Sequence, residues 1–251
     1  MKNTAVENVR VSEAGSSSKL AENLERIEAQ IAMACREAGR ARAEVALMAV
    51  SKMHPSAAIL AAEALGIRLF GENRVQEFQE KRVQLGPSTG AEFHLIGHLQ
   101  SNKAARAVEL FASIDTLDSL SLAERLNQAA IRLGRRLAVL IEIKLSHETS
   151  KAGIPPDSDE LQELLEQLPG LSGLELRGLM TVPPYLTDLA AVRPYFARLR
   201  LLRDQMAAAH PRLSFAELSM GMSHDFPIAI AEGATQVRIG TALFGARKYA
   251  K

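Results

Sequence analysis

The feature that most constrains the fold of this chain is the repeated alternation of short apolar segments with longer helical patterns. Eight segments carry the apolar runs that are typical of strands in a parallel sheet. They are residues 45–50, 67–70, 92–96, 112–114, 137–145, 174–180, 215–218 and 236–239. Helical patterns begin between them near His54, Asn73, Ser101, Ser119, Asp157, Asp188 and Ser223. Eight strands that alternate with helices over about 200 residues predict an α/β protein with a single (β/α)8 TIM barrel.

The start of the chain precedes this pattern. Residues 1–18 show no apolar periodicity and include a run of three serines, so we predict a mobile tail there. From residue 20 the apolar residues recur at helical spacing, and Gly39 stands where a helix C-cap is expected. No linker rich in Gly, Pro or Ser divides the rest. We therefore predict one domain over residues 19–251, in which an N-terminal helix precedes the barrel.

Charge and composition exclude several classes of protein. The 30 Lys and Arg residues nearly balance 29 Asp and Glu residues, which leaves no basic footprint for nucleic acid or an anionic membrane. A single cysteine, Cys35, cannot form an internal disulfide, and its helical surroundings indicate a packed thiol. The sequence contains no apolar run long enough for a membrane span and no secretory signal at its start. We expect a cytoplasmic protein.

The ends of the predicted strands carry the candidate site, because TIM barrels build their sites at the carboxyl ends of the strands. Lys52 follows the first strand. Ser219-Met220-Gly221-Met222-Ser223 follows the seventh strand, and Gly240-Thr241 follows the eighth, where phosphate is often held in this fold. Barrel closure places the eighth strand beside the first, so we expect Lys52 to share one mouth with these loops.

A lysine beside a phosphate-binding loop suggests a ligand with both a carbonyl and a phosphate. Backbone N–H groups of glycine-rich loops bind phosphate oxygens, and a lysine amine can form a Schiff base. Pyridoxal 5'-phosphate has both groups. Ser223 also stands where the N-cap of the next helix is expected, so it could be only a cap. Equally, Gly240 could only turn the chain, and Lys52 could be an ordinary loop lysine.

Arg238 lies within the eighth predicted strand, between two apolar neighbours. Strand alternation places its guanidinium on the opposite face from them, where an unpaired charge would be costly. If Arg238 faces the mouth, its permanently charged donors would hold a pyridine nitrogen unprotonated. The alternative is an arginine on the outer face, paired with a helix carboxylate.

The motifs at these strand ends resemble those of the YggS/PROSC family of pyridoxal phosphate homeostasis proteins. They are Ala49-Val50-Ser51-Lys52, Gly71-Glu72-Asn73-Arg74-Val75-Gln76-Glu77, His94-Leu95-Ile96-Gly97-His98-Leu99-Gln100-Ser101-Asn102-Lys103, Gly178-Leu179-Met180, Ser219-Met220-Gly221-Met222-Ser223 and Val237-Arg238-Ile239-Gly240-Thr241-Ala242-Leu243-Phe244-Gly245. The resemblance spans residue 20 to the C-terminus, and Phe93 stands where the family pattern has tryptophan.

The resemblance implies a fold-type III barrel like the N-terminal domain of alanine racemase, with pyridoxal 5'-phosphate bound covalently to Lys52. It also implies roles for the other residues of the mouth. Ser219, Ser223, Gly240 and Thr241 would hold the phosphate, Arg238 would approach the ring nitrogen, and Asn73 would line the pocket. The function implied is cofactor homeostasis and carriage without robust turnover, in a monomer that passes the cofactor to apo-enzymes.

Other interpretations are weaker. Ser223-His224-Asp225 contains the residue types of a hydrolase triad, but adjacent side chains diverge. His94 and His98 would lie about 13 Å apart on an extended segment, too far to share a metal ion. Asn73 with Gln76 resembles a capping box, so Asn73 could be a helix cap. Lys151 could be a second amine near the mouth or a solvated loop lysine.

Two enzyme classes compete with the carrier. An amino-acid racemase on the same barrel needs a second acid or base on the far face of its substrate, and alanine racemase takes that tyrosine from an added domain. Of the three tyrosines Tyr185, Tyr195 and Tyr249, Tyr185 is the best substitute because it follows the sixth strand. A lysine-dependent aldolase fits less well, because its lysine usually lies on a later strand.

Overall fold

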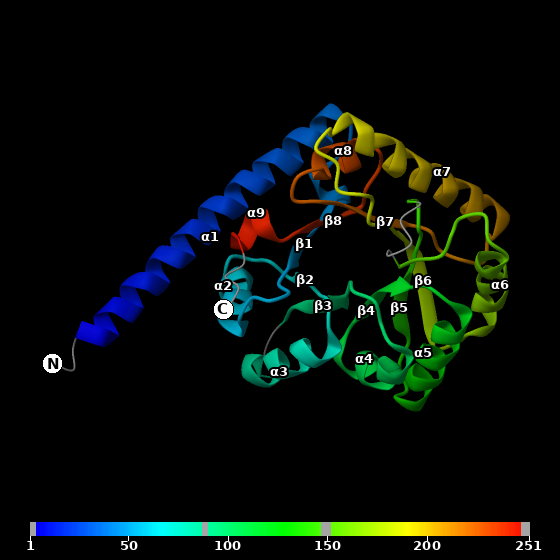
Figure 1. Ribbon diagram of the computed structural model, residues 1–251, viewed down its shortest axis with the longest axis horizontal. Helices are drawn as coiled ribbons and strands as arrows, with labels where there is room; N and C mark the ends of the chain where they lie inside the picture. Colours follow the sequence, from blue (N-terminus) through cyan, green and yellow to red (C-terminus); the bar gives the residue numbers. More distant parts are fainter. Residues whose placement is uncertain (1–3, 87–89, 147–151, 247–251) are drawn as a thin grey trace.

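The computed structural model describes residues 4–86, 90–146 and 152–246, with side chains from residue 18 onward. Its centre is a closed parallel barrel in which the strands pair in sequence order (Figure 1). The strands are β1 (Ala46–Val50), β2 (Leu69–Glu72), β3 (Glu92–Leu95), β4 (Ser113–Leu117), β5 (Leu137–Glu142), β6 (Leu174–Met180), β7 (Glu217–Met222) and β8 (Gln236–Ile239). The predicted (β/α)8 barrel is confirmed. Closure comes from β1 against β8, with Ala46 opposite Gln236 and Ala49 opposite Ile239.

Helices follow the strands and surround the barrel (Figure 1). They are α2 (Ser56–Ala64), α3 (Val75–Leu85), α4 (Ala104–Leu110), α5 (Leu120–Arg132), α6 (Asp159–Gln167), α7 (Arg193–Ala209), α8 (Phe226–Ala231) and α9 (Thr241–Phe244), with 3-10 turns at Arg42–Glu44, Ser101–Lys103, Leu168–Gly170 and Ala190–Val192. Helix α5 illustrates the pattern. Its N-cap Ser119 accepts a hydrogen bond from the Leu122 N–H, and Leu122 and Leu126 are buried. Within the described ranges, none of the helices combines the length and apolar character that a membrane crossing requires.

Helix α1 (Thr4–Glu37) is longer than the sequence pattern predicts. It begins at Thr4, so the segment predicted as a mobile tail over residues 1–18 is helical from Thr4 onward. Residues 4–14 contain neither proline nor glycine, so the helix that packs on the barrel from residue 20 onward can propagate back toward Thr4. Whether this part is mobile stays a prediction.

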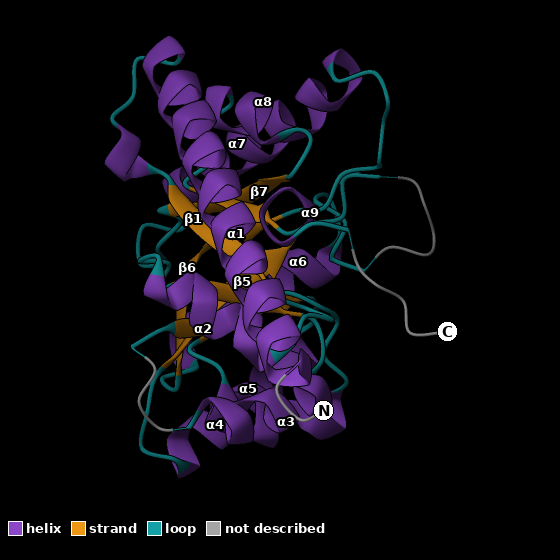
Figure 2. Ribbon diagram, turned by 90° about the vertical axis from the view of Figure 1, so that its left-hand side faces the viewer, coloured by secondary structure: helices purple, strands orange, loops and turns teal. Residues whose placement is uncertain are grey.

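The second half of α1 packs on the outside of the barrel. Figure 2 shows the helix crossing in front of β1. The predicted apolar positions Leu20, Ile27, Ile31 and Cys35 are buried, and α1 contacts α8 and α9. The amide of Asn23 donates a 2.9 Å hydrogen bond to the carbonyl oxygen of Leu243. Gly39 has φ +67° just after the helix, as a C-cap glycine requires.

Phe93 packs within an aromatic cluster between the barrel and α3. Its ring centroid lies 5.4 Å from that of Phe70 and 4.5 Å from that of Phe78. All three rings are buried. Phe93 therefore contributes to the packing of α3 on the barrel.

Candidate functional site

The end of β1 lies beside the turn that follows β8. A Cβ added to Gly240 would lie 3.4 Å from the Cβ of Val50, which is two residues before Lys52. Lys52 itself is partly buried in a turn, in which the N–H of His54 donates to the carbonyl oxygen of Ser51 at 3.0 Å. The structure therefore brings the β1 lysine turn and the β8 glycine turn to the same end of the barrel.

The hydroxyl of Ser223 joins the β7 turn to the β8 turn. Its Oγ accepts hydrogen bonds from the N–H groups of Gly240 and Ala242, both at 3.3 Å. Thr241, the first residue of α9, lies between these two donors and is exposed. The two N–H groups donate to Ser223 in this structure, and together with its hydroxyl they are the kind of donor set that binds a phosphate when its oxygens replace Ser223 as the acceptor.

The prediction that Ser223 is an N-cap is wrong. Helix α8 begins at Phe226, and its N-cap residue is Asp225, whose side chain accepts a 2.6 Å hydrogen bond from the Met222 N–H. The turn after β7 is therefore longer than the sequence suggests. Because it is longer, Ser223 can reach across to Gly240 instead of closing its own helix.

Ser219 lies away from the cluster formed by Ser223, Gly240 and Ala242. It is fully buried, and its Oγ accepts hydrogen bonds from Arg238 at 2.7 Å and from the amide of Gln236 at 2.8 Å. These partners occupy the hydroxyl inside the barrel, four residues before Ser223 along β7. The structure thus places Ser219 beside Arg238 and apart from the Ser223 turn, and its role in holding the phosphate stays a prediction.

Arg238 points into the end of the barrel. Its guanidinium donates to the carbonyl oxygens of Ser219 and Thr181, each at 2.7 Å, and thereby reaches from β8 across β7 to the end of β6. Burial lowers the pKa of Arg238, while the charges of Asp115 and Glu142 oppose that shift. The alternative of an arginine paired with a helix carboxylate on the outer face is wrong.

Asn73 follows β2 and packs against the turn after β3. A Cβ on Gly97 would lie 2.4 Å from the carbonyl oxygen of Asn73, so only glycine fits there. Helix α3 begins at Val75 after Arg74, with no side-chain cap, so the capping-box interpretation of Asn73 with Gln76 is wrong. The Asn73 Oδ1 atom is buried without a hydrogen-bond partner in the described part of the chain. An orphaned amide oxygen of this kind suits a pocket that receives a polar ligand.

Glu142 is a residue that the sequence analysis missed. It ends β5, is buried, and lines a cavity of about 170 Å³ with Lys144, Ser146 and Val182. Burial raises the pKa of Glu142 to about 7, although the charge of Arg238 opposes that shift. Its signal in the sequence is a single carboxylate at the end of the apolar run of residues 137–143.

A chain of polar side chains continues inward from Arg238. Ser219 and Asp115 both accept hydrogen bonds from Gln236, and Asp115 pairs with the Nδ1 of His94 at 3.1 Å. Although burial acts against both charges, the pairing raises the pKa of His94 and lowers the pKa of Asp115. Asp115 and Gln236 were not predicted as site residues, because in the sequence they resemble ordinary polar residues of strands.

The other predicted groups do not assemble into alternative sites. His94 pairs with Asp115, whereas His98 pairs with Asp118, also at 3.1 Å. Over the described ranges, no three His, Cys, Asp or Glu side chains are grouped to hold a metal ion. In the triad-like segment, the Nε2 of His224 lies 3.3 Å from the carbonyl oxygen of Leu186, while Ser223 bonds toward Gly240. The predicted second amine, Lys151, lies outside the described residues.

Comparison with known proteins agrees with this architecture. The family model for the N-terminal domain of alanine racemase matches residues 22–248. The pyridoxal phosphate homeostasis protein of Aquifex aeolicus is 42% identical over 228 residues, which cover 91% of this chain and 98% of that protein. The protein of the same name from Pseudomonas aeruginosa is 43% identical over 233 residues, which cover 92% of this chain and 97% of that protein.

Solved structures show the same relationship. The structure of PipY from Synechococcus elongatus PCC7942 with PLP bound has a TM-score of 0.81 and 42% identity, and the match covers 90% of this chain and all of that one. An alanine racemase of Clostridium difficile 630 has a TM-score of 0.67 at 18% identity, covering 93% of this chain and 58% of that one. The second match shows the barrel fold alone. The resemblance found in the motifs is therefore confirmed.

Proposed function

This chain belongs to the family of pyridoxal phosphate homeostasis proteins, and from that premise we propose that it binds pyridoxal 5'-phosphate through Lys52 and acts in the homeostasis and carriage of this cofactor. One observation carries the proposal. The turn that bears Lys52 lies at the same end of the barrel as the cluster of Ser223, Gly240 and Ala242. An amine and a phosphate-type donor set are what this ligand requires.

The residues of the mouth suit the cofactor. The Ser223 hydroxyl and the N–H groups of Gly240 and Ala242 would hold the phosphate, with Thr241 between them. The buried Oδ1 of Asn73 gives the pocket an acceptor that has no other partner in the described part. When bound, the cofactor supplies an aldehyde and a pyridine ring that can act as an electron sink.

Arg238 would weaken that electron sink. Its guanidinium can donate hydrogen bonds but cannot accept a proton, so a ring nitrogen beside it stays unprotonated. Its hydrogen bonds to Thr181 and Ser219 hold it at the same end of the barrel. The chain's own residues therefore favour retention of the cofactor over chemistry on it.

Within the described ranges, no second acid or base for racemisation is evident. The Tyr185 side chain is 75% exposed, and its ring lies 4.6 Å from the ring of His224. Tyr249 lies outside the described residues. We therefore expect weak turnover at most, and we expect the loaded, monomeric, cytoplasmic protein to pass its cofactor to apo-enzymes.

The test is the visible spectrum of the purified protein before and after borohydride reduction, followed by peptide mapping. We expect a yellow protein whose reduced adduct lies on Lys52, and we expect Lys52→Ala to lack that adduct. A label on Lys103 or Lys151 in the wild type would show that the β1 turn is the wrong attachment point. Absence of any reducible adduct would overturn covalent binding.

A further inference from the structure

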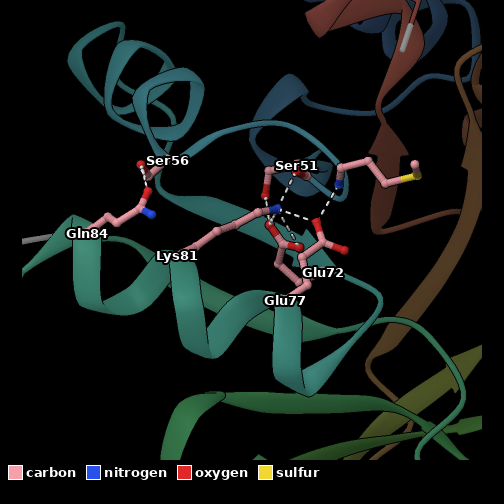
Figure 3. Close-up of polar contacts among 7 residues, drawn as sticks. Ser51, Ser56, Glu72, Glu77, Lys81 and Gln84 are labelled. Atoms are coloured by element: carbon pink, nitrogen blue, oxygen red, sulfur yellow. Dashed lines mark hydrogen bonds and ion pairs between the residues drawn. The ribbon is translucent and has the colours of Figure 1, made fainter. Parts of the chain in front are cut away.

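The turn that bears Lys52 rests on a buried ionic cluster formed by β2 and α3 (Figure 3). Its centre is Lys81, whose side chain is only 9% exposed. The ammonium of Lys81 donates to the carbonyl oxygen of Ser51 at 2.9 Å and to the carboxylate of Glu72 at 2.8 and 3.0 Å. It also lies 2.7 Å from Oε1 of Glu77, one turn earlier on α3.

The same two carboxylates hold the residues on either side of Lys52. The hydroxyl of Ser51 donates to Oε1 of Glu72 at 2.7 Å. The backbone N–H of Met53 donates to Oε1 of Glu77 at 2.5 Å. Lys81 therefore links both acceptors, so the residue before Lys52 and the residue after it are fixed through one ammonium group.

The backbone of this turn has a conformation that needs support. Met53 has φ +61°, in the left-handed region that residues with a Cβ rarely occupy, and it is the only such non-glycine residue in the described part. Its N–H is the group that Glu77 binds. The cluster thus acts at the strained position directly after Lys52.

Simple stability does not account for a buried lysine at this place. Replacing a buried ion pair with apolar residues of similar volume is often neutral or stabilising. Burial raises the pKa of Glu72, although the charge of Lys81 acts against that shift. What the cluster provides is a defined geometry, because each donor has a specific acceptor.

We propose that Lys81, acting through Glu72 and Glu77, is a positioning residue that orients the Ser51–Met53 turn so that Lys52 meets the cofactor carbonyl while the phosphate is held at the Ser223 cluster. The proposal rests on the proposed function. In the step concerned, the neutral Lys52 amine adds to the aldehyde carbon, a C=N bond replaces the C=O bond, and the oxygen leaves as water. Fixed geometry accelerates such a step, and small misplacements slow it strongly.

The test compares two ligands on the full chain, prepared without cofactor. Pyridoxal 5'-phosphate can react with Lys52, whereas pyridoxine 5'-phosphate has the same phosphate and a closely similar ring but no aldehyde. We expect Lys81→Met to slow formation of the borohydride-reducible adduct about tenfold or more. We expect its Kd for pyridoxine 5'-phosphate to stay within about twofold of wild type, because that Kd does not depend on Lys52 chemistry.

Ser56→Ala is the matched control. Ser56 donates a 2.7 Å hydrogen bond to Gln84, so it also links α2 to α3, but it lies at the outer end of the contact (Figure 3). This variant should leave both measurements unchanged. Glu77→Gln provides a second variant if Lys81→Met does not fold, since Glu77 is 25% exposed, and it should slow the adduct in the same selective way.

The outcomes separate the two claims. If wild type forms no adduct, the proposed function fails and the positioning role fails with it. If wild type forms the adduct and Lys81→Met forms it equally fast, only the positioning role is overturned. Equal losses for both ligands in Lys81→Met and Glu77→Gln would also overturn it, because a general loss of structure would then explain the data.

Discussion

One guanidinium nitrogen of Arg238 donates to both the carbonyl oxygen and the hydroxyl of Ser219, each at 2.7 Å. The two residues lie on neighbouring strands inside the barrel, so Ser219 acts as the support of the arginine. This arrangement assigns the two serines of the β7 motif to different tasks. Ser219 accepts hydrogen bonds from Arg238, and Ser223 accepts a hydrogen bond from the N–H of Gly240.

The two serines should therefore respond differently to removal of the hydroxyl. Ser223→Ala should weaken pyridoxal 5'-phosphate binding by about 1 to 3 kcal/mol, the range for a hydrogen bond to a charged group. Ser219→Ala should mainly lower the free energy of unfolding, by about 1 to 3 kcal/mol, because it leaves buried donors unsatisfied. Equilibrium binding and urea unfolding measure the two effects.

Ser158→Ala controls for the loss of a serine hydroxyl elsewhere. Ser158 accepts from the Leu161 N–H at the start of α6, so its loss should cost about 1 kcal/mol of stability without any change in binding. Equal affinity in wild type and Ser223→Ala would remove Ser223 from the phosphate site.

A methyl group at Gly240 should separate binding from folding. The added Cβ would lie in ordinary contact with Val50, 3.4 Å away, so stability should change by about 1 kcal/mol or less. The methyl group would nevertheless obstruct the approach of phosphate to the Gly240 N–H, so affinity should fall about tenfold or more. Calorimetry of Gly240→Ala with and without cofactor gives both values.

Gly178→Ala provides the contrast, because its Cβ would lie 1.9 Å from the carbonyl oxygen of Glu217 and should destabilise the fold strongly. Unchanged affinity in a folded Gly240→Ala protein would show that the phosphate does not approach this turn.

Glu142 should make stability depend on pH. Its pKa is about 7 in the folded protein and near 4.5 ordinarily, so the fold favours the protonated form. That contribution is fully present below about pH 4.5 and is lost as the pH rises through about 7. Glu142→Gln, which resembles the protonated form, should thus match wild type at pH 4 and exceed it at pH 8 by at most about 3 kcal/mol.

Urea unfolding at both pH values measures this difference, and Glu163→Gln on the exposed side of α6 controls for removal of a surface carboxylate. If Glu142→Gln is less stable than wild type at pH 8, Glu142 is instead a charged partner of Arg238.

Catalysis decides between a carrier and a racemase. We expect L-amino acids, alanine included, to show only marginal racemisation, decarboxylation or transamination, while the loaded protein restores activity to an apo-enzyme. Chiral chromatography measures racemisation, and recovery of apo-enzyme activity measures transfer of the cofactor. Multiple-turnover racemisation at about 1 per second or faster, lost in Tyr185→Phe, would overturn the carrier and place the second base after β6.

The sequence predicts the order of the barrel well because buried parallel strands read as continuous apolar runs. It predicts the ends of β4 and β7 poorly. Asp115 and Ser219 belong to those strands, but their side chains enter a polar interior that an apolar pattern cannot reveal.

The hydrogen-bond partners of Ser223 and Lys81 could not be predicted for another reason. A lysine on a helix ordinarily indicates a solvated face. Its buried role here depends on Glu72 at the end of the preceding strand β2 and on the carbonyl oxygen of Ser51, which follows β1.

The pairing of β1 with β8 also sets when the site can exist during synthesis. The residue proposed to carry the cofactor follows β1, whereas the proposed phosphate donors at Gly240 and Ala242 follow β8. A ribosome-bound chain would therefore expose Lys52 long before any phosphate donor emerges. Cofactor retention would begin only when the barrel closes, so the ligand would report on completed folding and would not assist its early stages.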